Sequence, residues 1–277
     1  MSFATDYIGQ LEKIATRMAL PRVRALHLPP AGELDDDIGE FCAIELDDGS
    51  IGLSYVLFNR ELRQESTTAD RLGIEGMDPL QLARAYASEK GLRKTVGFAA
   101  ANALTRCFYD RVGYVPEPSR DSIGGLDPVA GEHVGMIGFF KPLLQALTVR
   151  GSRLTILELK AELAGDNEGY RVTLDPQDLA DCTQALATGT ILLNDTLDAI
   201  LGACRHARRM SLIGPSVGCL PDALFQRGVT SVGGAWVMDA PAYIDALRRG
   251  ESRSAFSRKF AINREDYPGF ADLLATL

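Results

Sequence analysis

From His133 to Leu277 the sequence alternates short apolar runs with segments of helical periodicity, and this alternation restricts the fold more than any other feature. The apolar runs predict strands at His133–Phe139, Leu154–Leu159, Gln184–Thr188, Arg209–Gly214 and Ser231–Val237. Helices fit near Pro142–Val149, Asp195–Ala207, Pro221–Gln226 and Pro241–Arg248. Such alternation predicts a mostly parallel sheet with helices on both faces and with ligands at the carboxyl ends of its strands.

Residues 1–112 have a different pattern, which predicts an α+β fold. A helix near Ala4–Met18 is followed by strands at Val23–Leu28, Glu40–Leu46 and Ile51–Phe58, and then by helices near Pro79–Ser88 and Leu92–Phe108. The turn Asp47-Asp48-Gly49-Ser50 predicts that the last two strands form a hairpin, because glycine tolerates positive φ there.

The segment Val115–Glu132 contains three prolines, several glycines and few large apolar residues, as a connection between domains does. We therefore predict an α/β protein with an N-terminal α+β domain at residues 1–115, a linker at 116–132, and a second domain with a mostly parallel sheet at 133–277.

Composition excludes several classes of function. The net charge of −8 disfavours nonspecific binding to nucleic acid or to anionic lipid, both of which require basic patches. No apolar run approaches the roughly 20 residues that span a bilayer, and residues 1–6 lack the pattern of a signal peptide. The cysteines are five in number and scattered, which predicts reduced thiols and a cytoplasmic location: Cys42, Cys107, Cys182, Cys204 and Cys219.

The turn Gly214-Pro215-Ser216-Val217-Gly218 lies between a predicted strand and a predicted helix. Small residues at a strand end let a ligand approach the backbone, so we expect a site here. The turn also matches G-x-S-x-G, but a hydrolase of that class needs a later histidine, and all three histidines precede Ser216. Ser216 is therefore expected to be a polar ligand or a cap. The lone Cys219 after this turn is either a soft metal ligand or a small core residue.

The strand at His133–Phe139 carries Gly135 and Gly138, a partial form of the dinucleotide-binding fingerprint. Glu158 lies at the end of the next strand, where an acidic residue commonly binds ribose hydroxyls. This pattern favours a ligand that contains a nucleoside, such as a nicotinamide cofactor or S-adenosylmethionine. Alternatively, the two glycines allow close packing of a helix on the sheet, and Glu158 is a solvated strand end.

Two polar groups have both a binding interpretation and a structural one. The turn Thr188-Gly189-Thr190 offers hydroxyls for a carboxylate, phosphate or sugar, while Asn194 or Asp195 after it is expected to cap a helix. Asn102 interrupts a run of alanines on a predicted helix. It either makes a hydrogen bond between helices or faces the domain interface.

Together these segments resemble a two-part family of unknown function that carries the description of a putative heavy-metal chelation domain. The resemblance covers nearly the whole chain. It rests on an ordered set of motifs: Ala100–Leu104, Val134–Phe140, Thr188–Thr196, Gly214–Ser216 with Leu220–Asp222, Ser231–Gly234, and Asp239. The sequence departs from the family pattern at Val217-Gly218-Cys219 and at Lys141. Both departures fall at strand ends, so ligand preference is expected to differ from that of the relatives.

The resemblance implies an enolase-N-terminal-like domain followed by a Rossmann-like domain, with a site in the cleft between them. The expected ligand is a small polar molecule, a heavy metal or a metal complex; the alternative is an enzyme that uses a nucleoside-containing cofactor. The expected ligand-binding residues are Asn102, Gly138, Phe139, Lys141, Glu158, Thr188, Gly189, Thr190, Asn194, Gly214, Pro215, Ser216 and Asp239, with Cys219 as the candidate metal ligand. A homodimer is compatible with the sequence.

The spacing of metal-binding residue types predicts no closed metal site. There is no C-x-x-C or H-x-x-x-H, and the acidic run Asp35-Asp36-Asp37 is expected to be a solvated loop. If a transition metal is bound, we expect either a weak site at Cys219 and nearby carboxylates or a metal that arrives already bound by a small chelator.

Overall fold

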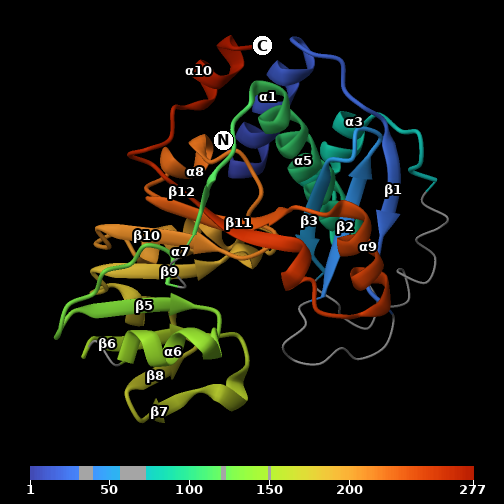
Figure 1. The fold of residues 1–277 in the computed structure, drawn as a ribbon. Coiled ribbons are helices and arrows are strands. Elements are labelled where there is room, and N and C mark those ends of the chain that lie inside the picture. Colours follow the sequence, from blue (N-terminus) through green and yellow to red (C-terminus); the bar gives the residue numbers. More distant parts are fainter. Residues whose placement is uncertain (31–39, 57–72, 120–122, 149–150) are drawn as a thin grey trace.

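A computed structural model describes residues 1–30, 40–56, 73–119, 123–148 and 151–277 of the protein. Within these residues the strands form two separate sheets (Figure 1). The predicted acidic loop Asp35-Asp36-Asp37 and the last two positions of the predicted strand Ile51–Phe58 lie outside the described residues.

The smaller sheet is antiparallel and has the order β1-β2-β3. Its strands are β1 (Val23–His27), β2 (Phe41–Leu46) and β3 (Ile51–Tyr55). The hairpin predicted at Asp47–Ser50 is confirmed, because β2 pairs antiparallel with β3. The helices in this half are α1 (Phe3–Ala15), α3 (Pro79–Ala83), α4 (Ala85–Ser88) and α5 (Gly91–Val112). The segment predicted as one helix at Pro79–Ser88 is helical but is divided at Arg84 into α3 and α4.

The larger sheet has nine strands in the order β4-β12-β11-β10-β9-β5-β6-β8-β7. The five predicted strands are β5 (His133–Ile137), β6 (Arg153–Leu157), β9 (Gln184–Thr188), β10 (Arg209–Ile213) and β11 (Ser231–Val237). The strands not predicted are β4 (Glu117–Pro118), β7 (Gly165–Asn167), β8 (Tyr170–Thr173) and β12 (Ser257–Asn263). Strands β4 and β7 are the two edge strands of this sheet, where short or polar segments suffice, and β12 and β8 lie next to them.

The parallel strands have the order β8-β6-β5-β9-β10-β11, which is the doubly wound order of a Rossmann-like sheet. The direction of winding reverses between β5 and β9. Ligands bind at such a reversal, outside the carboxyl ends of the strands.

The helices of this half are α6 (Lys141–Thr148), α7 (Leu197–Ala203), α8 (Asp222–Phe225), α9 (Ala240–Arg249) and α10 (Phe270–Ala275). Short 3-10 helices occur at η2 (Ala161–Leu163), η3 (Pro176–Leu179), η4 (Gly189–Leu192) and η5 (Ser254–Phe256).

Helix α5 is buried on nearly all sides, because it packs on the small sheet as well as on the other helices of its half. Its middle turns consist of alanines that are wholly buried: Ala99, Ala100, Ala101 and Ala103. Small side chains permit close approach of β3, where Gly52 faces the backbone of Ala99 and Ala103. One continuous hydrophobic cluster joins this helix to residues of the larger sheet. The boundary predicted near residue 115 stays a prediction.

Helix α9 belongs to the second half in sequence but packs on the small sheet (Figure 1). Its residues Tyr243, Ile244 and Leu247 share a cluster with Ala43 of β2 and Leu53 of β3. Beside this contact, His27 is 3% exposed, with Nε2 placed 2.9 Å from Oε2 of Glu45. Arg248 donates to Nδ1 of the same ring at 2.9 Å. A ring that accepts at Nδ1 carries its proton on Nε2, so His27 is neutral in this arrangement.

We expect the protein to lose stability as the pH falls from 7 toward 5. Burial lowers the pKa of His27 and of His133, and Arg248 and Arg153 respectively lower each further. Below the unfolded pKa of about 6.5 the unfolded chain binds protons that the folded chain does not, so the free energy of unfolding decreases with falling pH. Urea unfolding at several pH values measures this slope, and His27→Gln should reduce it. An unchanged slope in that variant would show that His27 makes no contribution.

Among the described residues, no helix is both long enough and apolar enough to cross a bilayer.

Candidate functional site

The carboxyl edge of the large sheet brings together predicted residues from β5 and β9 at the point where the strand order reverses. Gly138 follows β5 with a φ of +89°, a conformation that favours glycine, and its amide donates to the carbonyl of Leu157 at 3.0 Å. A Cβ on Gly138 would lie 3.1 Å from Cγ2 of Thr188 at the end of β9. The glycine therefore allows the β5 turn and the β9 turn to meet.

Glu158 supports this edge from the next strand. Its Oε1 accepts from the amide of Phe139 at 2.8 Å, and its Oε2 accepts from the amide of Leu159 at 2.9 Å. Two backbone amides thus hold the carboxylate for which the sequence suggested ribose binding. Each carboxylate oxygen has a further lone pair that is free to accept from a ligand. Lys141 is the first residue of α6 and is exposed beside the same turn.

The turn after β9 supplies hydroxyl groups. Thr188 caps η4 because its Oγ1 accepts from the amide of Thr190 at 3.3 Å, and the Thr190 hydroxyl donates to the same oxygen at 3.3 Å. Both threonines are half-buried. Gly189 is buried, and a Cβ there would lie 2.6 Å from Cγ2 of Val217. The β9 turn therefore packs directly on the β10 turn.

The far end of this loop is fixed to the first half of the chain. Lys94 of α5, whose side chain is 10% exposed, pairs with Asp195 at 2.5 Å. Asp195 has a φ of +61°, and Asn194 accepts from the amide of Thr196 at 3.2 Å. The helix predicted near Asp195–Ala207 is confirmed as α7, which begins at Leu197. Its N-cap is Thr196, so the prediction that Asn194 or Asp195 caps it is wrong. Asn194 instead makes its hydrogen bonds to Thr196 within the turn before the helix.

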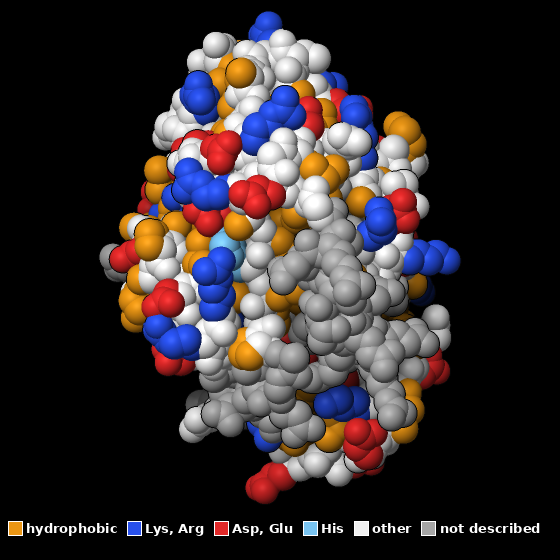
Figure 2. All heavy atoms as spheres, turned by 90° about the vertical axis from the view of Figure 1, so that its right-hand side faces the viewer, with side chains coloured by type: hydrophobic (Ala, Val, Ile, Leu, Met, Phe, Trp, Pro, Cys, Tyr) orange, Lys and Arg blue, Asp and Glu red, His pale blue; other side chains and the backbone are white. Residues whose placement is uncertain are grey.

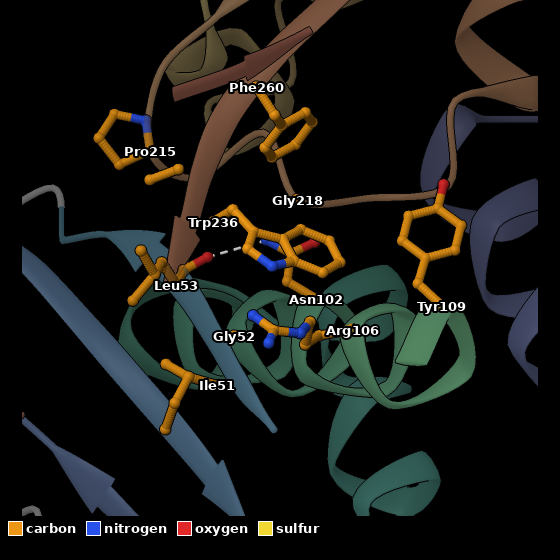
Figure 3. Close-up of a pocket in the computed structure, with 11 residues that line it drawn as sticks. Ile51, Gly52, Leu53, Asn102, Arg106, Tyr109, Pro215, Gly218, Trp236 and Phe260 are labelled. Atoms are coloured by element: carbon orange, nitrogen blue, oxygen red, sulfur yellow. Dashed lines mark hydrogen bonds between the residues drawn. The ribbon is translucent and has the colours of Figure 1, made fainter. Parts of the chain in front are cut away.

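The β10 turn divides into two parts. Gly214 and Pro215 face an open cleft, whereas Ser216 is 2% exposed and accepts from the amide of Tyr55 at 3.1 Å. Asn102, also 2% exposed, donates from Nδ2 to the carbonyls of Leu53 and Ser216, both at 2.8 Å. Figure 3 shows Asn102 between β3 and the β10 turn, with its bond to Leu53 drawn.

The remaining bond of Asn102 completes its set, since its Oδ1 accepts from the Tyr7 hydroxyl at 3.1 Å. Both interpretations of Asn102 therefore apply. Its side-chain amide has hydrogen-bond partners at both the nitrogen and the oxygen, and the residue lies where the two halves of the chain meet. With Ser216 it forms a tie between the halves. Asn102 also lines a small void of about 30 Å³.

The helix predicted near Pro221–Gln226 is confirmed as α8, which begins at Asp222. The carboxylate of Asp222 accepts from the amide of Phe270 at 2.8 Å. Asp239 caps α9 by accepting from the amide of Ala242 at 3.1 Å, and α9 lies on the small sheet. The structure gives Asp239 this capping role and does not bring it to the β5 and β9 turns.

Cys219 lies in the hydrophobic core at 2% exposure, and burial raises the pKa of its thiol to about 12. A thiol in this condition stays protonated and is a poor metal ligand. In the described parts of the chain, no three His, Cys, Asp or Glu side chains converge as a metal site would require. The rings of His27 and His133 already have contacts at both nitrogens.

A cleft of about 260 Å³ opens next to the reversal point. Residues from β10, β11, β12 and the start of α6 line it: Ser119, Gly124, Phe140, Pro142, Leu143, Ile213, Gly214, Pro215, Ser231, Gly233, Gly234, Ala235, Lys259, Phe260 and Ala261. Only Gly214 and Pro215 among these residues were predicted from the sequence. The run of small residues in β11 could have indicated the cleft, whereas β12 was not predicted as a strand and so gave no indication of it.

The molecular face at the right of Figure 1 carries no extended field of one charge among its visible described side chains. Figure 2 shows acidic and basic groups interspersed there with hydrophobic ones. This distribution agrees with the acidic composition and differs from the basic surface that nucleic acid requires.

Comparison with known proteins gives two family matches that share one description. Residues 124–265 and residues 38–105 each match a family model described as putative heavy-metal chelation. An uncharacterized protein of Methanocaldococcus jannaschii is 29% identical over 181 residues, which cover 63% of this chain and 67% of that protein.

Two solved structures of proteins of unknown function share the fold. The protein from Desulfitobacterium hafniense has a TM-score of 0.67 at 19% identity, covering 95% of this chain and 98% of that one. The protein from Pyrococcus horikoshii has a TM-score of 0.67 at 18% identity, covering 95% and 100%. At these identities the likeness shows the fold.

Proposed function

This chain belongs to the family described as putative heavy-metal chelation, and we propose that it binds a small metal complex at the carboxyl edge of its large sheet. In this proposal the metal arrives already held by a small organic chelator. The protein recognises the chelator at the turns after β5, β9 and β10. The metal requires no closed set of protein ligands.

The observation that carries this proposal is the kind of group found at the edge. Thr188 and Thr190 offer hydroxyls, Lys141 offers a cation, and the Gly214 turn offers backbone close to a cleft. These groups suit the oxygens and carboxylates of a chelator, whereas a soft transition metal prefers thiolate and imidazole. The described thiols are all buried and free, and burial raises the pKa of Cys42, Cys107, Cys182 and Cys219 to about 12.

The alternative is an enzyme with a nucleoside-containing cofactor. The doubly wound strand order and the position of Glu158 favour it. Against a dinucleotide, Phe139 and Phe140 follow Gly138 where further glycines would let a pyrophosphate approach the backbone. A cofactor without a pyrophosphate, of the S-adenosylmethionine type, therefore fits this site better than a dinucleotide does. A copurifying nucleoside would favour it. For either ligand we propose a cytoplasmic location.

We expect the double variant Thr190→Val, Lys141→Met to bind the complex at least about tenfold more weakly, because it loses a hydroxyl donor and a cation without loss of bulk. Elemental analysis and native mass spectrometry of the purified protein give the occupancy. The matched control is Thr276→Val, Lys13→Met, where both side chains are exposed and distant. Cys219→Ser should leave the metal content unchanged. Loss of metal from Cys219→Ser, with retention in the double variant, would contradict the proposed site.

A further inference from the structure

The cleft beside the reversal point has a floor of unusually small side chains. Ser231, Gly233 and Ala235 of β11 point to one face of the sheet, and their neighbours in β12 on that face include Ala261, opposite Gly233. Such residues leave the peptide planes uncovered, so the floor is flat. Phe140, Pro142 and Leu143 stand at the side formed by α6. The space between is therefore shaped for a flat apolar body.

One polar group at the floor lacks a partner. Ser231 is 6% exposed and lines the cleft, and its hydroxyl makes no hydrogen bond with the rest of the described chain. Because the residue is mostly buried but its hydroxyl reaches the cleft, the hydroxyl is available to a ligand there, and a hydrogen bond to it would help to orient the ligand. By contrast Ser211, on the same face of β10, donates to the carbonyl of Gly124.

A cation lies at the opposite end of the floor. Lys259 pairs across from Ala235, lines the cleft and is exposed, and it forms no ion pair with the described residues. Ser231 and Ala235 are four residues apart along β11, which is about 13 Å of strand. The deep end of the cleft thus offers a hydroxyl and its mouth offers a positive charge.

We propose that this cleft binds a flat aromatic carboxylate, with its ring on the Gly233 floor, a polar substituent at Ser231 and its carboxylate at Lys259. The inference deepens the proposed function and rests on it, because it names the chemical class of the chelator's organic part. The ring replaces water on apolar surface, and the two polar ends fix its direction. The open end near Phe140 and Pro215 places the carboxylate beside the turns that bind the metal complex.

The test uses 4-hydroxycinnamate as the probe, because it is planar and carries a hydroxyl and a carboxylate at opposite ends. Titration followed by NMR should give a Kd of about 1 mM or tighter. Lys259→Met should weaken binding at least about fivefold, and Ser231→Ala should remove the preference for the probe over cinnamate, which lacks the hydroxyl. Ala261→Leu should abolish binding by filling the floor. Lys13→Met serves as the matched control for lost charge.

Circular dichroism of each variant separates lost binding from lost folding. If Ala261→Leu does not fold, Ser231→Ala and Lys259→Met still decide the outcome. Absence of saturable binding to the wild-type protein, or equal binding by Lys259→Met, would overturn this inference. Such a result would leave the proposed function standing if the metal complex still occupied the protein. Conversely, probe binding with no bound metal complex would remove the proposed function and keep the cleft.

Discussion

Gly52→Ala will destabilise the protein by on the order of 4 kcal/mol, enough to unfold much of it under native conditions. A Cβ at Gly52 would lie 2.0 Å from the backbone nitrogen of Ala103 and 2.1 Å from the carbonyl oxygen of Ala99. Both contacts are with the backbone of a buried helix, so no side chain can move aside. Either β3 or α5 must shift, and both belong to the core. Urea unfolding measures the loss.

The matched control is Gly202→Ala in α7, where an added Cβ meets nothing within 4 Å. Alanine is the better helix former, so this variant should gain up to about 1 kcal/mol. Equal stability of the two variants would show that β3 and α5 are not packed as closely as described.

Asn102→Leu will cost about 3–5 kcal/mol, the second largest effect that we expect. The substitution leaves the carbonyls of Leu53 and Ser216 without this donor, and it removes one of the two partners of the Tyr7 hydroxyl. All of these groups are buried, so water does not replace the lost bonds readily. Thermal and urea unfolding give the change.

Because Asn102 joins α5, β3 and the β10 turn, its loss should also move the turn that contains Gly214. Binding of the metal complex should therefore weaken even at temperatures where the variant stays folded. Asn167→Leu, at an exposed position of the edge strand β7, should change stability by no more than about 0.5 kcal/mol. Full stability of Asn102→Leu would show that the tie between the halves is dispensable.

The strand–helix alternation after His133 predicted the large parallel sheet, because buried parallel strands are continuous apolar runs. The hairpin at Asp47–Ser50 was equally readable from its turn residues. The sequence did not predict β8 or β12. Strand β8 contains only Tyr170–Thr173, and β12 has two adjacent charged residues followed by three apolar ones, so it shows neither strict alternation nor a long apolar run. Strand order was also out of reach, since pairing depends on contacts distant in sequence.

The candidate site was predicted in part. Residues that end strands, such as Gly138 and Thr188, meet because the carboxyl ends of β5 and β9 adjoin. Residues that were predicted from their chemistry alone have structural roles instead. Asp239 caps a helix, Asn194 makes hydrogen bonds within its own turn, and Cys219 is a core residue, because periodicity does not tell which way a side chain faces in a turn. The cleft needed β12, so its cation Lys259 could not be found from the sequence.

The most direct test of the central claim is native mass spectrometry of freshly purified protein combined with elemental analysis. We predict that a metal and a small organic molecule are bound together, in equal amounts, and are lost together when the chelator site is altered by Thr190→Val, Lys141→Met. Apoprotein that binds free metal tightly at one equivalent, without an organic molecule and with four protein ligands in its spectrum, would contradict the proposed function.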